Sequence, residues 1–295
     1  MAPSASALRV AQNKQRQREL FAANALSQPT HRICPTAPDA VGAADEIGYP
    51  VVVKAAEGGY DGRGVWSCAD QAALQSVAAE CQVRGITMIV EERVPLDQEL
   101  AILVARDARG SLAVYPVVET LQVDGICRQV DLSRAHYRGR SGPASELAVA
   151  IAELIGLTGI MAVELFESGD RLLINEIATR PHNSGHYTIE AVTTSQFEQH
   201  LRAILGLPLG STKLLAKAAA TVNILGGTDG SNPRERLPAA LAMTGVAVHL
   251  YGKEPRPGRK LGHVTVVGHV PDRCADRAWK AVELLTNESR PEAVR

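Results

Sequence analysis

The chain has 295 residues, of which 45% are hydrophobic and 21% are charged, and both values are ordinary for a folded globular protein. Its 31 Lys and Arg residues nearly balance its 32 Asp and Glu residues, which gives a formal net charge of −1. This balance argues against a nucleic-acid or lipid-surface function, because both favour a basic excess. Any anionic ligand must therefore be held by a local cluster of cations.

The cysteines and the apolar segments indicate the cellular compartment of the protein. Five cysteines are scattered along the chain without a Cys-x-x-Cys pair, which predicts neither a disulfide framework nor a zinc site. No apolar run approaches the length of a membrane span, and the first residues lack the profile of a signal peptide. We therefore expect a cytoplasmic protein with reduced thiols and with neither a membrane nor a nucleic acid as partner.

Helix and strand patterns are mixed along the chain, and several of the strands form antiparallel hairpins. This mixture predicts an α+β fold rather than a doubly wound parallel sheet. Residues 1–10 are small and polar, and we expect them to be loose. The expected elements are helices at 11–25, from the cap Asp70 to 83, from Pro143 to 156, from the cap Ser195 to 206 and near 276–285, and strands at 51–53, 87–93, 99–106, 112–119, 126–130, 160–166, 172–177, 219–225, 246–251 and 264–267.

A glycine-rich stretch follows the first buried strand. Three consecutive valines at 51–53 predict that strand, and Lys54 lies at its end. Glycines at 58, 59, 62 and 64 permit positive φ angles and let backbone N–H groups approach a ligand. The lysine adds a mobile cation for phosphate oxygens. Although the Walker A and Rossmann patterns are absent, the stretch predicts a nucleotide phosphate cradle. The alternative is a glycine-rich hairpin that binds nothing.

A predicted hairpin carries two glutamates at matching distances from its turn. Glu164 and Glu176 lie six residues on either side of Asp170, so a symmetric hairpin places them opposite each other on one face. Like charges in that arrangement are destabilising unless a cation lies between them. With Asn175 beside them, these oxygen ligands suit Mg²⁺. The alternative is a solvated face with two independent glutamates.

Three further polar sets are candidates for ligand contacts. Glu91, Glu92 and Glu99 bracket a hinge-like segment whose backbone could read an adenine edge and whose carboxylates could meet ribose hydroxyls, although without further context ordinary surface charge at a strand end explains them better. The loop at 180–186 contains two histidines that could bind a metal, but its Asn and Ser suit hydrogen bonding to a polar substrate better. The loop at 251–263 contains Lys253, Arg256, Arg259 and Lys260, which predicts a phosphate monoester site or a solubilising turn.

Four motifs then occur in the order found in one known family. They are Gly-Gly-Tyr-Asp-Gly-Arg-Gly, Glu-Glu-Arg-Val-Pro-Leu-Asp-Gln-Glu-Leu, Asn-Glu-Ile-Ala-x-Arg-Pro-His-Asn-Ser-Gly-His and Tyr-Gly-Lys-x-x-Arg-Pro-Gly-Arg-Lys-x-Gly-His. From Lys14 onward the chain closely resembles the carboxyaminoimidazole ribonucleotide synthase family, the ATPase subunit of phosphoribosylaminoimidazole carboxylase and a branch of the ATP-grasp superfamily. The resemblance implies an ATP-grasp fold, with a first subdomain at 1–95, a second subdomain carrying the Mg²⁺ carboxylates at 96–212, and a small β-rich C-terminal domain at 213–295.

The resemblance also implies the reaction. ATP and bicarbonate would react through carboxyphosphate, and the amine of 5-aminoimidazole ribonucleotide would be carboxylated with release of ADP and phosphate. Mg²⁺ would be the metal cofactor, and a homodimer is a candidate assembly. Clustered cations and Mg²⁺ stabilise the charge on a transferring phosphoryl group, which is most of what such catalysis requires.

The family's functional residues are carried over by position. Lys54, Asp61 and Arg63 are the expected catalytic residues, and Glu164 and Glu176 are the expected metal ligands. The expected ATP contacts are Lys14, Lys54, Gly59, Tyr60, Asp61, Gly62, Arg63, Gly64, Val65, Glu91, Glu92, Arg93, Val94, Glu99, Gln122, Asn175 and Glu176. The expected ribonucleotide contacts are Tyr60, Asp61, Arg63, His182, Asn183, Ser184, Lys253, Arg259 and Lys260.

The sequence departs from the family pattern in several places. The Gly-x-Gly-Gln-Leu-Gly-type start of the family's N-terminal domain does not occur, and Val65, Gln122 and Thr179 stand where Gln, His and Pro are usual. One alternative is therefore a remnant that binds ATP without turnover or that needs a separate partner chain. Another is a different ATP-grasp ligase, such as biotin carboxylase or formate-dependent glycinamide ribonucleotide transformylase. The loops at 182–186 and 256–260 argue against the latter.

Overall fold

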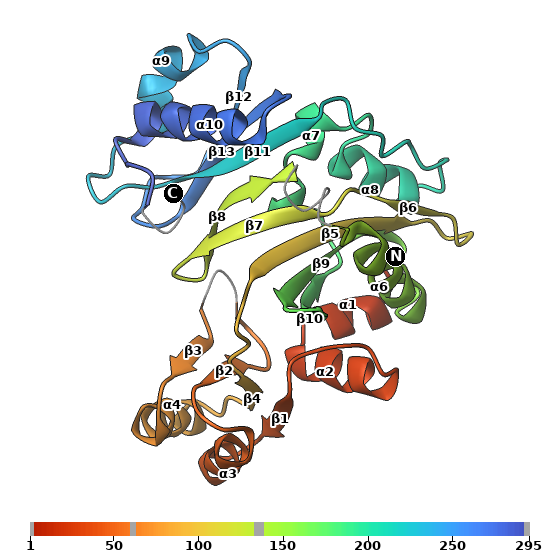
Figure 1. The fold of residues 1–295 in the computed structure, drawn as a ribbon, viewed down its shortest axis with the longest axis vertical. Coiled ribbons are helices and arrows are strands. Elements are labelled where there is room, and N and C mark those ends of the chain that lie inside the picture. Colours follow the sequence, from red (N-terminus) through yellow and green to blue (C-terminus); the bar gives the residue numbers. More distant parts are fainter. Residues whose placement is uncertain (1–2, 60–62, 133–138, 292–295) are drawn as a thin grey trace.

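The computed structural model describes residues 3–59, 63–132 and 139–291, which form two antiparallel sheets flanked by helices (Figure 1). This arrangement confirms the predicted α+β class. The helices are α1 Ala5–Ala11, α2 Lys14–Ala23, α3 Ala37–Ile47, α4 Gln71–Val83, α6 Ser141–Leu154, η1 Asn183–Gly185, α7 Thr188–Ala191, α8 Gln196–Ile204, η2 Pro233–Arg236, α9 Leu237–Leu241 and α10 Pro271–Thr286. The strands are β1 His31–Cys34, β2 Val51–Ala55, β3 Val65–Cys68, β4 Met88–Glu92, β5 Gln98–Arg106, β6 Leu112–Val114, β7 Val118–Val123, β8 Ile126–Asp131, β9 Gly159–Ser168, β10 Arg171–Ala178, β11 Ala218–Leu225, β12 Val246–Leu250 and β13 Lys260–Gly268.

The smaller sheet has the strand order β1-β4-β2-β3, and it projects from the rest of the molecule (Figure 1). Helices α3 and α4 pack against it around one apolar core. Val51 and Val53 of β2 are both fully buried, as alternate residues of a strand with one covered face should be. The sheet thereby fixes the direction in which the next residue, Lys54, leaves its core.

The larger sheet runs β10-β9-β5-β7-β8-β11-β13-β12, with β6 also paired to β5. Residues of β5 alternate between two cores: Leu100 and Ile102 pack in one core with residues of α1, α2 and α6, whereas Ala101 and Leu103 pack in another with Tyr187 and residues of α7. Two-sided burial explains why this strand is apolar at nearly every position.

The C-terminal strands continue the same large sheet. Strand β11 pairs with β8 on one side and with β13 on the other, and α10 covers β11 and β13 with a core that contains Trp279. The division of the chain at 95 and 212 stays a prediction. In the described residues, no helix is long and apolar enough to cross a membrane.

Three local predictions were wrong. Residues 1–10 are not loose throughout, because Ser4 accepts a hydrogen bond from Ala7 N–H and caps α1. A single strand at 112–119 was expected, but β6 ends at Val114 and β7 begins only at Val118, because Pro116 has no N–H for a ladder. The last helix begins at Pro271, earlier than expected, with proline in its first turn.

The predicted helix caps at Asp70 and Ser195 are confirmed. The Asp70 side chain accepts a hydrogen bond from Ala73 N–H, and the Ser195 side chain accepts one from Glu198 N–H. The reciprocal half of the capping box is replaced, because the Glu198 carboxylate pairs with Arg202 one turn later. Ser195 thus begins α8 with Gln196 as its first helical residue.

Candidate active site

The two sheets meet at Lys54. Its ammonium lies 2.8 Å from Asn175 Oδ1 in β10 and 2.8 Å from Glu91 Oε2 in β4, and it stands 5.7 Å from the ring centre of Phe166. The side chain is only 8% exposed, and burial lowers the pKa of Lys54 while the Glu91 carboxylate acts in the opposite direction. A buried lysine with two acceptors is thus fixed where the two sheets meet.

Glu164 and Glu176 are register partners across β9 and β10, as predicted, but for a different reason. Next to the turn, Arg171 pairs with Ser168, so the hairpin is centred between Gly169 and Asp170 rather than on Asp170. An irregularity between Ile174 and Glu176 then shifts the register by one residue. This β-bulge restores the opposition of the two glutamates, and it makes Asn175 the extra residue.

Asn175 uses its side chain in two directions. Its Oδ1 accepts the bond from Lys54, and its Nδ2 donates to Glu164 Oε2 at 3.3 Å. Its backbone carbonyl accepts a bond from Arg18 Nη2 at 2.9 Å. The bulge residue therefore links the smaller sheet, the carboxylate pair and helix α2.

Burial and neighbouring charge set the protonation of the carboxylates. Burial, then the carboxylates of Glu176 and Glu99, raise the pKa of Glu164 to about 8. Burial also raises the pKa of Glu99 to about 7. Burial opposes ionisation of Glu176 as well, but its ion pair with Lys14 and the charge of Lys54 hold the pKa of Glu176 below its usual value. The negative charge of Glu176 is thus compensated by lysines, whereas that of Glu164 is not.

This imbalance fits a divalent cation at the pair. Apart from Lys14, no cation is among the groups that set the pKa of Glu164. A hard cation between the two carboxylates would supply the missing positive charge. Among residues 3–59, 63–132 and 139–291, no group of three or more acidic, histidine or cysteine side chains is placed to bind a metal. The remaining ligands would therefore be phosphate oxygens and water.

Glu91 does not face an open adenine site in this structure. Its carboxylate is 2% exposed and lies between Arg18 Nε at 2.7 Å and Lys54 Nζ at 2.8 Å. Burial opposes its ionisation, but the two cations outweigh burial and lower the pKa of Glu91 to about 2. Sequence reasoning missed Arg18, which is 1% exposed and carries no recognisable motif. Only the packing of α2 against β4 and β10 identifies it.

The described ends of the glycine loop lie beside Glu176. Tyr60, Asp61 and Gly62 fall outside the described residues. A Cβ on Gly59 would come 2.8 Å from the carbonyl oxygen of Arg63, and Gly64 has φ +75°, so both positions require glycine. Val65, the first residue of β3, pairs with Lys54.

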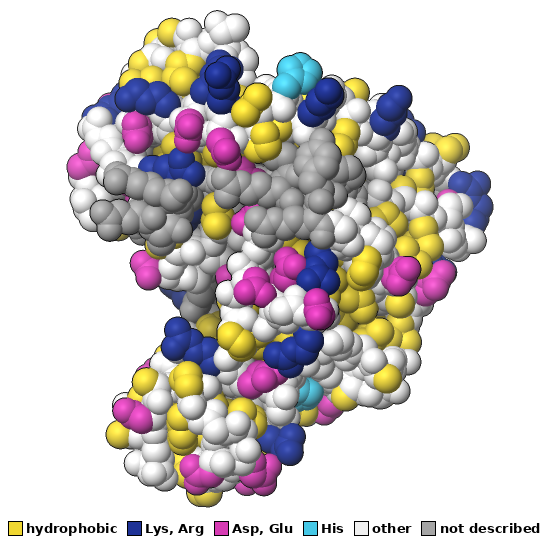
Figure 2. All heavy atoms as spheres, in the orientation of Figure 1, with side chains coloured by type: hydrophobic (Ala, Val, Ile, Leu, Met, Phe, Trp, Pro, Cys, Tyr) yellow, Lys and Arg dark blue, Asp and Glu magenta, His cyan; other side chains and the backbone are white. Residues whose placement is uncertain are grey.

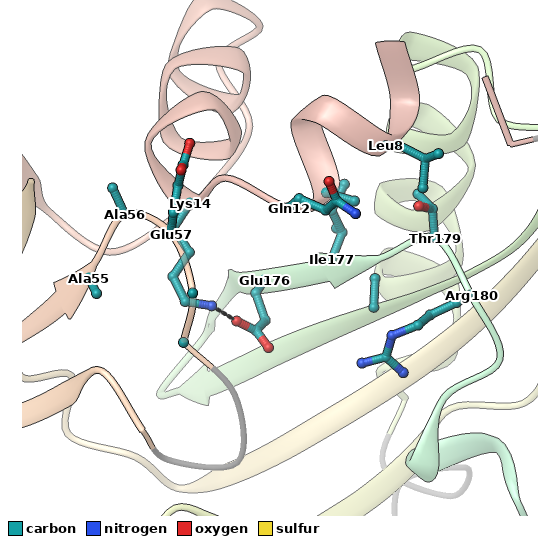
Figure 3. Close-up of a pocket in the computed structure, with 14 residues that line it drawn as sticks. Leu8, Gln12, Lys14, Ala55, Ala56, Glu57, Glu176, Ile177, Thr179 and Arg180 are labelled. Atoms are coloured by element: carbon teal, nitrogen blue, oxygen red, sulfur yellow. Dashed lines mark hydrogen bonds and ion pairs between the residues drawn. The ribbon is translucent and has the colours of Figure 1, made fainter. Parts of the chain in front are cut away.

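A cavity of about 380 Å³ lies beside the described start of this loop (Figure 3). Its lining includes Lys14, Gly59, Glu176 and Thr179, together with Arg180, whose guanidinium extends toward the same space. Lys14 forms an ion pair with Glu176 there. Arg180 belongs to the third sequence motif, but the family resemblance gave it no role.

The 182–186 turn brings His182 to the carboxylate pair. His182 Nε2 lies 3.4 Å from Glu164 Oε1, and His182 Nδ1 lies 2.9 Å from Ser184 Oγ. Asn183 exchanges two hydrogen bonds of 2.8 Å with Asn223 of β11, which holds this turn on the large sheet. The alternative of a metal site made by the two histidines gains no support from these contacts.

A stack of aromatic rings connects this turn with the loop at 251–263, called the basic loop below. The ring of His186 stacks on that of His263 with 4.6 Å between centroids, and Tyr251 Oη lies 2.7 Å from His263 Nδ1. Lys253 stands 5.2 Å from the Tyr251 ring centre, while Arg259 donates to the Glu254 carbonyl. Lys260 begins β13, three residues before His263. The two loops therefore form one region.

Several predicted ATP contacts lie away from the carboxylates. Gln122 is four residues along β7 from Val118, which is aligned through β5 with Glu164, so the Cα atoms of Gln122 and Glu164 are separated by about 13 Å or more. Glu92, the last residue of β4, pairs with Arg171 at 3.7 Å. Arg93 and Val94 follow in the connection to β5, where Val94 is buried. Glu99 pairs with Phe166, on the face that carries Glu164.

Two protein families match separate parts of the chain. Residues 19–197 match the ATP-grasp domain, and residues 219–277 match the phosphoribosylaminoimidazole carboxylase C-terminal domain. The first match contains Lys54, Asn175 and both carboxylates. The second contains the basic loop and His263.

Individual relatives agree with these matches. N5-carboxyaminoimidazole ribonucleotide synthase of Mycobacterium bovis is 42% identical over 97% of this chain and 68% of its own length, and that of Vibrio parahaemolyticus is 37% identical over 96% and 74%. The crystal structure of the Aspergillus clavatus N5-carboxyaminoimidazole synthase in complex with ADP and 5-aminoimidazole ribonucleotide superposes with a TM-score of 0.87, at 30% identity over 96% of this chain and 75% of that one. The chain therefore belongs to the N5-carboxyaminoimidazole ribonucleotide synthase family of ATP-grasp proteins.

Proposed function

We propose that this protein carboxylates the amine of 5-aminoimidazole ribonucleotide with ATP and bicarbonate, by way of carboxyphosphate, in purine biosynthesis. It is then an ATP-dependent carbon–nitrogen ligase. The observation that carries the proposal is the convergence of Lys54, Asn175 and the Glu164–Glu176 pair where the two sheets meet. Cations and paired carboxylates at one point suit phosphoryl transfer, which depends on positioning and charge stabilisation.

The residues of the site divide the task. Lys54 and Lys14 bind phosphate oxygens, and on nucleotide binding they exchange their present partners, Glu91 and Glu176, for the ligand. Glu164 and Glu176 would hold Mg²⁺, which supplies charge neutralisation for the phosphates. The predicted catalytic roles of Arg63 and Asp61, and the ATP contacts along the glycine loop and at Glu91 to Val94, Glu99 and Gln122, remain part of the proposal.

Bicarbonate fits the cavity beside Glu176. Lys14 and Arg180 supply cations to its lining, and Thr179 supplies a hydroxyl. A small planar anion gains from a planar guanidinium, which can donate two parallel hydrogen bonds. Glu176 of the carboxylate pair lines the cavity, so bicarbonate there would lie near a phosphate bound at Lys54.

The ribonucleotide would occupy the region formed by the 182–186 turn and the basic loop. His182, Asn183 and Ser184 offer hydrogen bonds to the base and sugar, and Lys253, Arg259 and Lys260 offer cations to the 5′-phosphate. Tyr60, Asp61 and Arg63 complete the set carried over from the family. Cytoplasmic location stays a prediction.

The proposal is tested by measuring phosphate release from ATP in the presence of bicarbonate and Mg²⁺, with and without 5-aminoimidazole ribonucleotide. Stimulation by the ribonucleotide is the expected result. Tight ATP binding without stimulated release would instead establish that this chain binds the nucleotide without independent turnover.

A variant of Glu176 tests the metal role. Glu176→Ala should abolish Mg²⁺-dependent turnover with little loss of stability, because the side chain is one third exposed and its neighbour Lys14 can be solvated. Turnover is measured with the phosphate assay, and folding is checked by thermal unfolding. Retained turnover would refute the role of Glu176.

We also propose that the chain assembles as a homodimer through α8. Phe197, Leu201 and Leu205 are exposed at intervals of four residues, while Gln196 and Gln199 of the same helix are buried. An apolar stripe that faces outward needs a covering surface. A second copy related by a twofold axis suits it, because antiparallel helices would bring Glu198 of each copy toward Arg202 of the other.

A further inference from the structure

Gln196 is a fully buried amide at the start of α8, and it lies directly beneath the 182–186 turn. Its Oε1 accepts a hydrogen bond of 2.8 Å from His182 N–H, and its Nε2 donates one of 2.8 Å to the His182 carbonyl. The second proton of Nε2 points to His186 Nδ1 at 3.1 Å. One side chain thus binds the backbone of the first residue of the turn and the ring of the last.

The backbone of His182 fixes the orientation of this amide. Only the oxygen can face the His182 N–H, so the nitrogen must face the carbonyl and His186. His186 Nδ1 is then an acceptor, which leaves the proton of the neutral ring on Nε2. Burial lowers the pKa of His186 to about 3, and this neutral form is therefore the one present near pH 7.

The turn and the amide are packed closely together. A Cβ on Gly185 would approach both Gln196 Oε1 and Leu103 Cδ2 more closely than atoms can, so the turn backbone rests directly on the amide. Thr188 adds a further link, because its hydroxyl donates to the Gly185 carbonyl and accepts the Gln196 N–H at 2.9 Å. A different side chain at 196 would change the turn itself.

The two histidines held by Gln196 contact different parts of the site. His182 reaches Glu164 of the carboxylate pair, and His186 stacks on His263, which is bonded to Tyr251 beside Lys253. Together with the Asn183–Asn223 pair, this amide sets the distance of His182 from Glu164 and the place of the basic loop relative to the turn. The position of the ribonucleotide relative to the phosphoryl centre depends on it in turn.

We propose that Gln196 is a positioning residue for the carboxylation step: it sets the 182–186 turn so that the ribonucleotide is held at the carboxylate pair. This role rests on the proposed function. Gln196 touches neither Lys14, Lys54 nor Asn175 through any of the bonds described above, so its loss should alter the use of the ribonucleotide and leave nucleotide binding intact.

The chain contains a matched control on the same helix. Gln199 is also fully buried, and it makes the same two-point contact with a backbone: Nε2 donates to the Gly210 carbonyl at 2.8 Å, and Oε1 accepts the Gly210 N–H at 2.7 Å. Gly210 belongs to the connection after α8, away from the turn. Replacing either glutamine with methionine removes one buried amide clamp, so the structural cost is similar.

The experiment compares Gln196→Met with Gln199→Met in the phosphate-release assay, with ADP affinity and thermal unfolding measured on both. Gln196→Met should lower kcat/KM for the ribonucleotide by about 10- to 100-fold, the usual effect of losing a residue that orients a ligating or reacting group. ADP affinity should change less than threefold in both variants. Gln199→Met should lose stability to a similar extent and keep kcat/KM within about threefold.

A charged replacement gives a pH readout that loss of stability alone would not. In Gln196→Glu the ionised carboxylate can still accept the His182 N–H but can donate to neither the His182 carbonyl nor His186, whereas the protonated acid can donate once. Its rate relative to wild type should therefore fall as pH rises through the carboxyl pKa, which burial raises. The titratable groups around this position are His182 and His186 of the turn, with His249, Lys260 and His263 behind them.

The outcomes separate the two proposals. If the wild type is active, two results would overturn the role of Gln196 and leave the function standing. One is an equal loss of rate in Gln196→Met and Gln199→Met. The other is a rate of Gln196→Glu, relative to wild type, that does not change with pH. A wild type without ribonucleotide-stimulated release would refute the proposed function, and the positioning role would fall with it.

Discussion

Glu164 is the residue whose charge state the fold controls most directly. Its carboxyl has a pKa of about 8 because it is buried and faces Glu176 and Glu99. The Asn175 amide donates to it, but an amide does not replace a cation. A buried carboxylate pair of this kind is costly without a nearby cation, which makes the pair a candidate cation site.

The pH dependence of stability follows from this pKa. Between the ordinary glutamate value of 4.5 and about 8, the unfolded chain loses the Glu164 proton while the folded chain keeps it, so this group lowers stability as pH rises through that window. Glu164→Gln removes the penalty. We expect it to raise the melting temperature at pH 8 without Mg²⁺ by about 2–4 °C, with no gain at pH 4.5.

The exposed Glu153→Gln on α6 is the control, and it should change the melting temperature at neither pH. Glu164→Gln should at the same time lose Mg²⁺-dependent turnover. An equal gain at both pH values would show that the carboxyl at 164 is not buried against other acids.

At the level of elements, α2 is held to both sheets by one guanidinium. Arg18 pairs with Glu91 of β4 and donates to the carbonyl oxygens of Ile174 at 3.2 Å and Asn175 at 2.9 Å in β10. Both carboxylate and guanidinium are 2% exposed. Removing one partner of such a buried pair leaves an incompletely compensated charge.

Arg18→Met should therefore lower the free energy of unfolding by about 3–5 kcal/mol, as measured by urea denaturation. Arg84→Met removes the exposed i,i+4 pair with Glu80 on α4 and should cost less than about 1 kcal/mol. If both variants cost the same, α2 does not depend on this pair.

At the scale of the whole molecule, the smaller sheet projects from the larger one, and the candidate site lies where they meet (Figure 1). On the face drawn in Figure 2, acidic and basic side chains are interspersed without a large patch of one sign, consistent with the net charge of −1. Anionic substrates are therefore bound by the local cations of the site, not by a general field.

The proposed dimer gives a prediction at this scale. Leu201 and Leu205 are 54% and 68% exposed, so replacing both with Asp should leave the fold intact and convert a dimer to monomers in sedimentation equilibrium. Val83→Asp, at an 89% exposed position on α4, is the control and should leave the dimer unchanged. A wild type that sediments as a monomer would refute the interface.

Sequence patterns alone predicted the local structure and the chemistry of the motifs. The alternating apolar residues gave the strands, and the caps Asp70 and Ser195 gave helix starts. These features depend on residues close together in the chain, where backbone geometry limits the outcomes. Where one residue breaks the local rule, as Pro116 does, the prediction failed.

Only the tertiary structure identified Arg18 and Gln196 and joined the 182–186 turn to the basic loop. Arg18 meets Glu91 across 73 positions of sequence, and Gln196 meets a turn on another element. Even the opposition of the glutamates depends on a bulge at Asn175 that spacing did not reveal. Such contacts are decided by how sheets and helices pack, and a buried polar residue carries no periodic signal of the partner it will meet.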